Sequence, residues 1–470
     1  MLEFVELPDC FYPRDAITII TPCAPTPKHS LYLSNLDDQK FLRFSIKYLY
    51  LFKKSVSIEA LKCSLSRVLV DYYPLAGRLR KNNNNDDDDH KLEVDCNGEG
   101  AVLAEAFMDS TIEDLIEASK VPNKSWRKLM YKVEAQSFLD IPPLVLQVTN
   151  LRCGGMILCT AINHCLCDGI GTSQFLHAWA QLTKNPNTKL TIIPFHGRHV
   201  LKSRDPPQVR FPLPGYTKTK PTQQVELLKL MQSQPLVATS FTFGSHQVLQ
   251  LKKQCIPSLK CTTFEVMAAH TWRSWIGSLN LNSDLTVKLL FSINIRKSMN
   301  LPQGYYGNGF VLGCAQSKVK DLVCNNNNNN NNNNHLHHGV KLVQQAKATT
   351  WDNNGEYIRS MIDFLEDKNV RTDLSASMVI SQWSKLGLED LDFGEGKPLH
   401  MGPLTSDVYC LFLPVVGDAD AVRVLVSVPE SMVESFRHHM MVKESWESHR
   451  EKNNEDVNTN GYHVEEKLFV

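Results

Sequence analysis

No stretch of the sequence approaches the roughly 18 consecutive apolar residues that a membrane-spanning helix needs. The first residues, MLEFVELPDCFYPRD, lack the basic-then-apolar order of a secretory signal. An excess of charge of either sign is also missing, because 50 lysines and arginines balance 50 aspartates and glutamates. A nucleic-acid-binding protein usually carries a basic excess. We therefore expect no nucleic-acid partner and no transmembrane segment.

The cysteines lack the spacing of a disulfide framework. All 13 are scattered, and several lie inside apolar segments, among them Cys159 and Cys410. Buried free thiols are typical of a reducing compartment. We therefore expect a cytoplasmic protein.

Several catalytic signatures are absent as well. There is no P-loop, no H-E-x-x-H and no G-x-S-x-G, and Gly307, Gly309 and Gly313 have the wrong spacing for a dinucleotide fingerprint. The His and Cys side chains of HCLCD (164–168) are crowded into five residues, with no second pair at a finger-like spacing. We therefore expect no metal site.

The most informative stretch runs from Met156 to Leu182. An apolar run of strand length, MILCTAIN, ends at His164-Cys-Leu-Cys-Asp168-Gly169, and apolar residues then recur at helical spacing. A His and an Asp four residues apart thus stand where a buried strand turns into an amphipathic helix. Such a turn is rigid on one side and open on the other, which suits a catalytic base.

Other interpretations of this turn remain open on these residues alone. His164 could be a hydrogen-bonded core residue, and Asp168-Gly169 could be ordinary turn chemistry. Cys165 as a nucleophile with His164 as its base is geometrically poor, because adjacent residues of a strand point to opposite faces.

At 470 residues the chain should form two or more domains. The region from Asn185 to about Thr222 is rich in Pro, Lys and Arg and poor in periodic apolar residues, which predicts a long crossover. We predict an N-terminal domain at 1–190, a linker at 191–222 and a C-terminal domain at 223–470. Strands and helices mix in both halves, so the class is α/β (mixed α+β).

The local patterns predict individual elements. We expect strands at 41–52, 91–95, 238–243, 287–293 and 421–428. Ser57 should cap one helix, Thr262 and Glu265 should form a capping box on another, and further helices should lie near 355–366 and 430–441. The low-complexity runs at 82–90 and 325–334 are expected to be surface insertions.

Taken together, the motifs resemble those of the BAHD family of plant CoA-dependent acyltransferases. HCLCDG (164–169) is similar to the family's H-x-x-x-D-G motif, and DFGEG (392–396) is similar to its D-F-G-W-G motif. The supporting matches are YYPLAGRL (72–79), TTFEVMAAHTWR (262–273), INIRKSMNLPQGYYGNGF (293–310) and ISQWSKLGL (380–388).

The resemblance implies a fold and a pair of substrates. It implies two similar chloramphenicol-acetyltransferase-like domains with a solvent channel between them. Acyl-CoA, as co-substrate rather than bound cofactor, and a hydroxyl-bearing small molecule would enter from opposite faces. A monomer is expected.

The resemblance also implies residue roles. His164 would be the general base that takes the proton of the acceptor hydroxyl. Asp168 would pair with Arg296 and shape the loop instead of acting as a triad partner. Ser381 is a candidate oxyanion donor, and Trp383 would lie on the acceptor side.

The second motif departs from the family pattern at one residue. Asp392, Phe393, Gly394 and Gly396 match, but Glu395 stands where the family usually has Trp. Loss of the indole could weaken packing or the CoA-side geometry, or could mark a relative without transferase activity.

Within the family, the LSNLD, DYYPLAGRL, GEGAV, NHCLCDGIG and LPQGYYGNG stretches look closest to hydroxycinnamoyl transferases that act on ω-hydroxy fatty acids or fatty alcohols. Because fold does not fix substrate, two alternatives stay open. One is a non-catalytic accessory protein of fatty-acid elongation. The other is an acetyltransferase acting on another plant alcohol.

Overall fold

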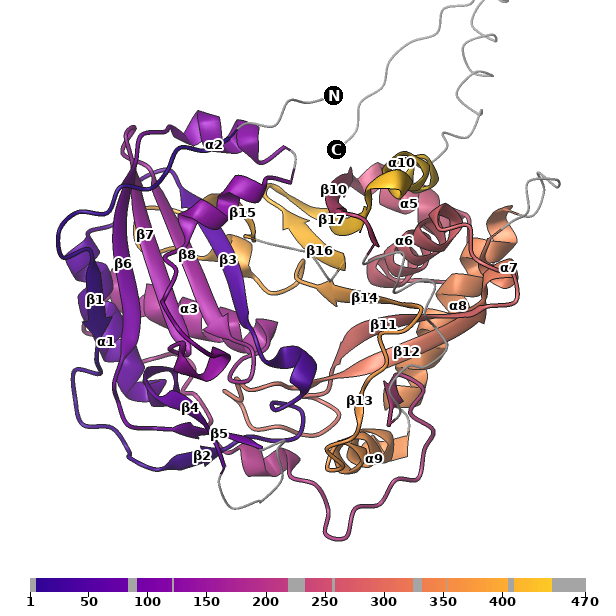
Figure 1. Cartoon of the computed structure of the whole chain (residues 1–470), viewed down its shortest axis with the longest axis horizontal. Coiled ribbons are helices and arrows are strands. Elements are labelled where there is room, and N and C mark those ends of the chain that lie inside the picture. Colours follow the sequence, from indigo (N-terminus) through magenta and orange to yellow (C-terminus); the bar gives the residue numbers. More distant parts are fainter. Residues whose placement is uncertain are drawn as a thin grey trace, which may run out of the picture.

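Two six-stranded sheets dominate the computed structural model and stand beside each other in Figure 1. The structure describes residues 6–82, 91–120, 122–218, 233–255, 258–323, 332–351, 353–404 and 410–441. The insertions predicted at 82–90 and 325–334 therefore lie outside the described residues, apart from Asn82 and the residues from Asn332 onward.

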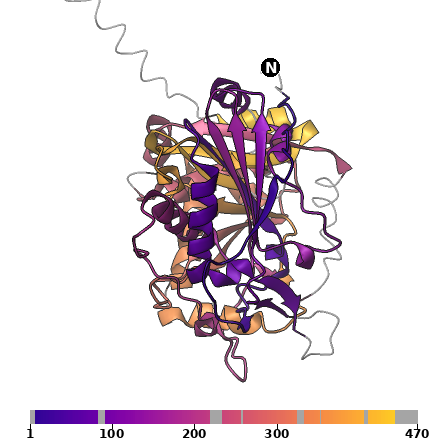
Figure 2. The same cartoon turned by 90° about the vertical axis from the view of Figure 1, so that its left-hand side faces the viewer.

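The first sheet belongs mainly to the N-terminal half. Its strands in spatial order are β1 (Ile17–Ile20), β6 (Ala101–Met108), β7 (Leu144–Leu151), β8 (Met156–Asn163), β3 (Ser45–Phe52) and β15 (Pro398–Pro403). Only β6 and β7 pair in parallel. Helices α1 (Ile58–Asp71) and α3 (Gly169–Lys184) pack on one face, and α2 (Ile112–Ala118) packs on the other (Figure 2).

The alternation of side chains along β3 explains these two layers. Tyr48 and Tyr50 belong to the apolar core under α1 and α3, whereas Leu49 and Leu51 belong to the core that contains Leu115 of α2. Both faces are covered, so the strand is apolar along most of its length. It begins at Ser45, later than the predicted residue 41, because residues 40–42 form a short 3-10 helix.

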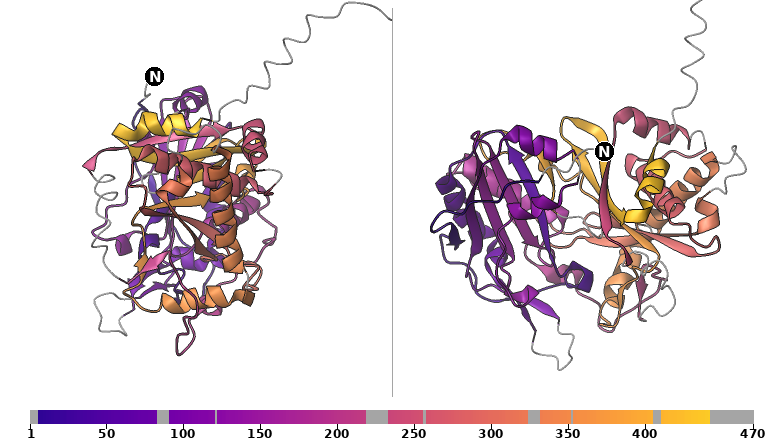
Figure 3. Two further views of the ribbon diagram at one scale, coloured as in Figure 1. Left: turned by 90° about the vertical axis from the view of Figure 1, so that its right-hand side faces the viewer. Right: turned by 45° about the horizontal axis from the view of Figure 1, so that its top comes forward.

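The second sheet lies in the C-terminal half. Its order is β10 (Leu236–Phe243), β17 (Asp418–Pro429), β16 (Cys410–Val415), β14 (Ser377–Gln382), β11 (Thr286–Asn294) and β12 (Phe310–Lys318). Figure 3 shows helices gathered on its outer side: α5 (Ser245–Lys253), α6 (Thr263–Ser278), α7 (Val319–Leu322), α8 (Asn332–Trp351) and α10 (Val433–Met440). Helix α9 (Glu356–Phe364) lies at the lower end of this half in Figure 1.

Smaller pairings complete the fold. β2 (Ser30–Tyr32), β5 (Leu92–Asp95) and β4 (Arg78–Lys81) form one sheet, and β9 (Tyr216–Thr217) pairs with β13 (Arg371–Thr372). Every helix among the described residues is too short or too polar to cross a membrane.

The predicted helix caps are confirmed. The Ser57 side chain accepts the Ala60 N–H at the start of α1. Thr262 accepts the Glu265 N–H at 3.3 Å, and the Glu265 carboxylate accepts the Thr262 N–H at 2.9 Å, so that each residue satisfies a free helix-end donor of the other. The mixed α/β class is also confirmed.

One strand crosses from the second half of the chain into the first sheet. β15 lies within residues 223–470 but pairs with β3, with Met401 opposite Tyr50. Phe393, just before it, is 2% exposed and belongs to the apolar core under α1 and α3. The division at 191–222 stays a prediction, and the structure adds that residues 383–404 pack with the N-terminal half.

Candidate active site

His164 stands on the loop that joins β8 to α3. Its backbone N–H donates to the Phe44 carbonyl at 2.9 Å, which ties the loop to the start of β3. Gly171, in the first turn of α3, permits a close backbone approach: a Cβ atom there would lie 1.8 Å from the Tyr306 carbonyl oxygen. The loop is therefore held against segments from both halves of the chain.

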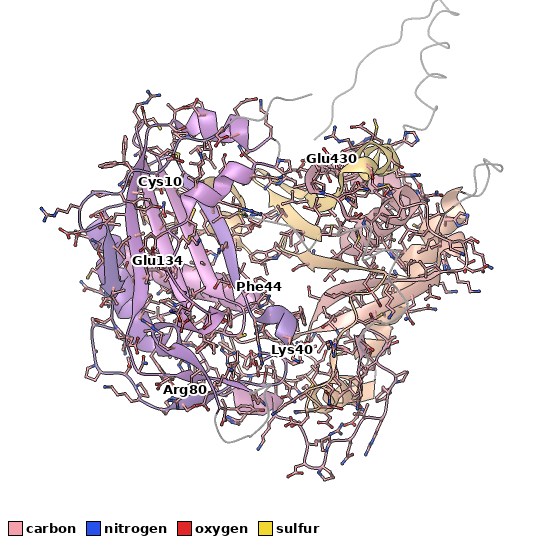
Figure 4. All side chains as sticks on the ribbon, viewed as in Figure 1. Cys10, Lys40, Phe44, Arg80, Glu134 and Glu430 are labelled. Atoms are coloured by element: carbon pink, nitrogen blue, oxygen red, sulfur yellow. The ribbon has the colours of Figure 1, made fainter. Side chains whose placement is uncertain are left out.

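A cavity of about 530 Å³ opens beside His164. Its walls come from both halves and are mostly apolar, with Phe44, Ile46 and Tyr48 from the first half and Phe310, Leu312, Val379 and Leu411 from the second. Figure 4 labels Phe44, which lies where the two halves face each other. An apolar space with a few polar groups is typical of a small-molecule site.

The His164 ring is half-buried between two aromatic rings. The Phe44 ring meets it edge-on at 5.4 Å between centroids, and the Phe310 ring lies at 6.1 Å. Burial lowers the pKa of His164, an effect that nearby Asp168 opposes only in part. Nδ1 is buried and has no hydrogen bond to any described residue. Nε2 is thus the ring nitrogen left to take a proton from a molecule in the cavity.

The hydrogen bonds of the Asp168 carboxylate go to residues other than His164. Arg296 donates from Nη1 to Oδ2 at 2.8 Å and from Nη2 to Oδ1 at 2.9 Å, the bidentate geometry that guanidinium groups favour. The backbone N–H groups of Gly171 and Gly309 donate to the same carboxylate at 2.8 and 3.0 Å. Burial would raise the pKa of Asp168, but Arg296 and these donors outweigh it and the net shift is downward.

The pair implied by the resemblance is therefore present in the structure. Because Asp168 caps α3 while Arg296 follows β11, the ion pair joins the two halves directly behind the loop that bears His164.

A second connection to the loop was missed by sequence reasoning. The Asn308 side-chain amide donates to the His164 carbonyl at 2.7 Å and to Asp37 Oδ1 at 3.0 Å, and the Asn308 N–H also donates to Asp37 at 2.9 Å. All three partners lie in stretches that carry the family resemblance. Nothing in their spacing, however, indicates that residues 37, 164 and 308 meet.

Arg198 was also missed. It lies in the predicted linker, is 1% exposed, and donates from Nη2 to the Leu166 carbonyl at 2.8 Å. Its guanidinium stands 4.6 Å from the centre of the Tyr306 ring. A Cβ atom at Gly307 would lie 1.2 Å from Nη1, so the glycine makes room for this side chain. The crossover is thus fastened to the loop that bears His164.

Ser381 and Trp383 both line the cavity. Trp383 is 6% exposed and stacks on Tyr48, with 5.0 Å between ring centroids and 6° between ring planes. Ser381 sits half-buried on β14. The structure brings both residues to the same cavity as His164, and their roles in the reaction stay predictions.

The loop at 392–396 lies apart from the cavity. Asp392 Oδ1 accepts the N–H groups of Gly394 and Gly396 at 2.8 and 3.0 Å, and its Oδ2 accepts from Lys184 at 2.7 Å. Both glycines have left-handed backbone angles, with φ of +117° and +107°. Phe393 packs edge-on against Trp179 of α3, 4.9 Å between centroids. The motif therefore ties α3 to the segment that leads into β15.

Comparison with known proteins identifies the family of this chain. The family model described as "Transferase family" matches residues 16–443. The chain belongs to this transferase family. Fatty alcohol:caffeoyl-CoA acyltransferase of Arabidopsis thaliana is 35% identical, over 90% of this chain and 96% of that protein. Omega-hydroxypalmitate O-feruloyl transferase of the same plant is 32% identical, over 90% of this chain and 91% of that protein.

Solved structures show the same fold at low sequence identity. Vinorine synthase superposes with a TM-score of 0.66 at 20% identity, covering 89% of this chain and 95% of that chain. F. graminearum TRI101, complexed with coenzyme A and T-2 mycotoxin, superposes with a TM-score of 0.74 at 15% identity, covering 87% of this chain and 97% of that chain.

Among the described residues of this transferase, no group of three or more His, Cys, Asp and Glu side chains is placed to hold a metal ion. His164 is the only imidazole among the described residues that line the cavity.

Glu395 of the transferase lies on the surface. Its side chain is 46% exposed and its Oε2 lies 3.6 Å from Lys54 Nζ, and it is absent from the described residues that line the cavity. The departure from the family's Trp therefore changes a surface position and leaves the surroundings of His164 intact.

Restoring the aromatic residue should change little. We expect Glu395→Trp to keep kcat/KM within about twofold of wild type, because a surface substitution distant from the reacting groups usually costs below about 0.5 kcal/mol. Phe393→Ala is the contrasting variant. It empties a buried site and should lower the free energy of unfolding by about 3–5 kcal/mol. Steady-state kinetics and urea unfolding measure both. A tenfold change in kcat/KM for Glu395→Trp would contradict this assignment.

Proposed function

We propose that this transferase moves a hydroxycinnamoyl group from CoA to the hydroxyl of a fatty alcohol or an ω-hydroxy fatty acid. The observation that carries the proposal is the mostly apolar cavity of about 530 Å³ with His164 in its wall. Relatives at 32–35% identity bear the names of a fatty-alcohol caffeoyl transferase and an ω-hydroxypalmitate feruloyl transferase.

Proton transfer is the first requirement of the reaction. A hydroxyl is a weak nucleophile at neutral pH and needs a base beside it. His164, with its pKa lowered by burial, is neutral at that pH and can accept the proton at Nε2. The acceptor oxygen then attacks the thioester carbonyl of acyl-CoA directly. When the tetrahedral intermediate collapses, the C–S bond breaks and His164 returns the proton to the departing sulfur.

Direct transfer needs no acyl-enzyme intermediate. Both substrates can meet beside His164 because the cavity draws its walls from two halves of the chain. Ser381 lies in the same wall, and its hydroxyl is a candidate donor to the oxyanion of the intermediate. Removal of one such donor typically costs about 2.7–4 kcal/mol in transition-state stabilisation. Asp168 and Arg296 act as positioning residues, because their contacts fix the loop rather than the reacting atoms.

The test is product formation across a panel of substrates. Purified protein is given feruloyl-CoA, caffeoyl-CoA or acetyl-CoA, each with hexadecanol, ω-hydroxypalmitate or a short-chain alcohol. Esters are identified by mass spectrometry, and CoA release gives the rate. We expect the highest kcat/KM with a hydroxycinnamoyl-CoA and a long-chain acceptor. A preference for acetyl-CoA with a compact alcohol would overturn the proposal.

A further inference from the structure

A second cavity of about 410 Å³ adjoins the one beside His164. Pro403 of β15 lines both spaces. The Leu404 N–H donates to the Lys47 carbonyl at 3.1 Å, although Leu404 lines the second cavity and Lys47 the first. The two spaces are therefore neighbours along the pair β3–β15. The far wall of the second cavity comes from β10 and β17, the strands labelled near β15 in Figure 1.

The second cavity is lined by positive charge. Lys124, Arg127 and Arg423 contribute to its walls, and no aspartate or glutamate is found among the described residues that line it. His400 adds no charge at neutral pH, since burial and then the neighbouring Arg423 lower its pKa to about 3. Lys124 and Arg127 are exposed and Arg423 is half-buried, so cationic groups stand both at the rim and inside this space, where they favour an anionic ligand.

Arg423 is the most informative of these residues. It is half-buried on β17, and its Nη2 donates to the Met401 carbonyl at 2.9 Å. It forms no ion pair with a described carboxylate, and burial lowers its pKa, with Tyr48 acting the other way. Even a half-buried guanidinium without a counter-charge loses part of its hydration. A bound anion would supply the missing partner and could accept both N–H groups of the fork.

Much of the remaining wall is apolar, although Ser119, Asn123 and Ser240 also line it. Leu49, Val237 and Leu425 line the second cavity, and the Trp126 ring stacks over His400 with 6.0 Å between centroids. A ligand that suits this space carries an anionic group on an apolar body.

The position along β3 connects this site to the chemistry. Ser45 pairs with Asn163, the residue before His164, and Leu49 lies four residues further along the same strand. At about 3.3 Å per residue the strand advances about 13 Å between them. A long-chain molecule with its hydroxyl at His164 could therefore place its other end beside Arg423.

We propose that Arg423, with Lys124 at the rim, forms an anion subsite for a substrate whose reacting end lies at His164. Two substrates of the proposed function carry such a group: the ω-hydroxy fatty acid has a terminal carboxylate, and acyl-CoA has phosphates. This inference rests on the proposed function and adds to it the recognition of an anionic end distant from the reacting atom. The apolar walls favour the carboxylate.

The experiment compares two acceptors of equal chain length, ω-hydroxypalmitate and hexadecanol, with feruloyl-CoA as donor. Arg423→Met removes the charge and keeps an apolar side chain of similar length. Arg423→Lys keeps a positive charge but lacks the two parallel N–H groups of the guanidinium. Lys124→Glu reverses a charge at an exposed position, so it remains informative should Arg423→Met fold poorly. Arg437→Met, on the exposed side of α10, is the matched control. Thermal melting checks that each variant is folded.

We expect Arg423→Met and Lys124→Glu to raise KM for ω-hydroxypalmitate, by about tenfold for Arg423→Met, the loss typical of a charge-assisted hydrogen bond. The KM values for hexadecanol and feruloyl-CoA should stay within about twofold, Arg423→Lys should recover part of the loss, and Arg437→Met should match wild type. A rise in KM for feruloyl-CoA with both acceptors would also support the anion subsite and would assign it to CoA phosphate. Unchanged KM values for all three substrates in folded variants would overturn it.

Failure of the proposed function gives a different result. In that case the wild-type protein transfers no hydroxycinnamoyl group to either acceptor. Calorimetric binding of ω-hydroxypalmitate and of CoA to wild type and Arg423→Met then decides the subsite by itself. Weaker binding of either molecule to the variant supports it, and equal binding of both overturns it.

Discussion

Replacing His164 by alanine is expected to lower kcat by a factor of about 10²–10⁴, the usual contribution of a positioned general base. The melting temperature should change little. The ring is half-buried at the wall of a cavity, and its Nδ1 makes no hydrogen bond to the described residues. Stopped-assay measurement of CoA release at saturating acyl-CoA and acceptor gives kcat, and differential scanning fluorimetry follows folding.

The pH dependence of the wild-type enzyme provides an independent readout. Because burial lowers the pKa of His164 below its ordinary value of about 6.5, the base form persists into mildly acidic solution. We therefore expect kcat/KM to stay level as the pH falls to 6.5 and to decrease only at lower pH. Turnover of His164→Ala near the wild-type rate would reject the role of His164 as base. The proton of the acceptor hydroxyl would then have to pass to a different group of the cavity.

Asp168→Asn is expected to lower the free energy of unfolding by about 3–5 kcal/mol, the usual result of breaking a buried ion pair from one side. The amide cannot balance the charge of Arg296. Its nitrogen also cannot accept the N–H groups that the carboxylate now receives from Gly171 and Gly309. The His164 loop should shift as a consequence, so kcat should fall together with stability. Urea unfolding and steady-state kinetics on the same preparation measure both.

Asp284→Asn is the matched control for this variant. Asp284 is an exposed residue that forms ion pairs with Lys318 and Lys320 at the surface, and water screens such pairs. Its unfolding curve should overlay that of wild type. A purely catalytic defect in Asp168→Asn, with unchanged unfolding, would contradict the positioning role and would favour direct participation of Asp168 in proton transfer.

The local part of the fold could be read from the sequence because short-range physics decides it. The strand Met156–Asn163 is mostly apolar and is buried on both faces, and the capping box of Thr262 and Glu265 lies within four residues. The loop with His164 and Asp168 follows from the change of period between β8 and α3. The strand start at Ser45 could not be predicted, since residues 41–44 (FLRF) are also rich in apolar and aromatic residues.

Long-range partners could not be derived from pattern alone. Asp37 and Asn308 are separated by 271 positions. Only the packed structure lets the Asn308 side-chain amide donate both to Asp37 and to the His164 carbonyl. Arg198 belongs to a stretch whose composition predicts a solvated crossover, yet its guanidinium is buried against Tyr306. Polar residues of this kind give no periodic signal, because a single contact and not a repeated face fixes each of them.

The sequence by itself determined the mixed α/β class, the strand–loop–helix that carries His164, and the family to which the motifs belong. Tertiary structure alone decided that β15 completes the first sheet, that Glu395 faces solvent, and that Arg423 stands in a cation-lined space beside the cavity of His164. The physical reason is the distance along the sequence over which each effect acts. Backbone periodicity and capping act over a few residues, whereas burial, charge balance and the shape of a cavity arise only where distant segments pack together.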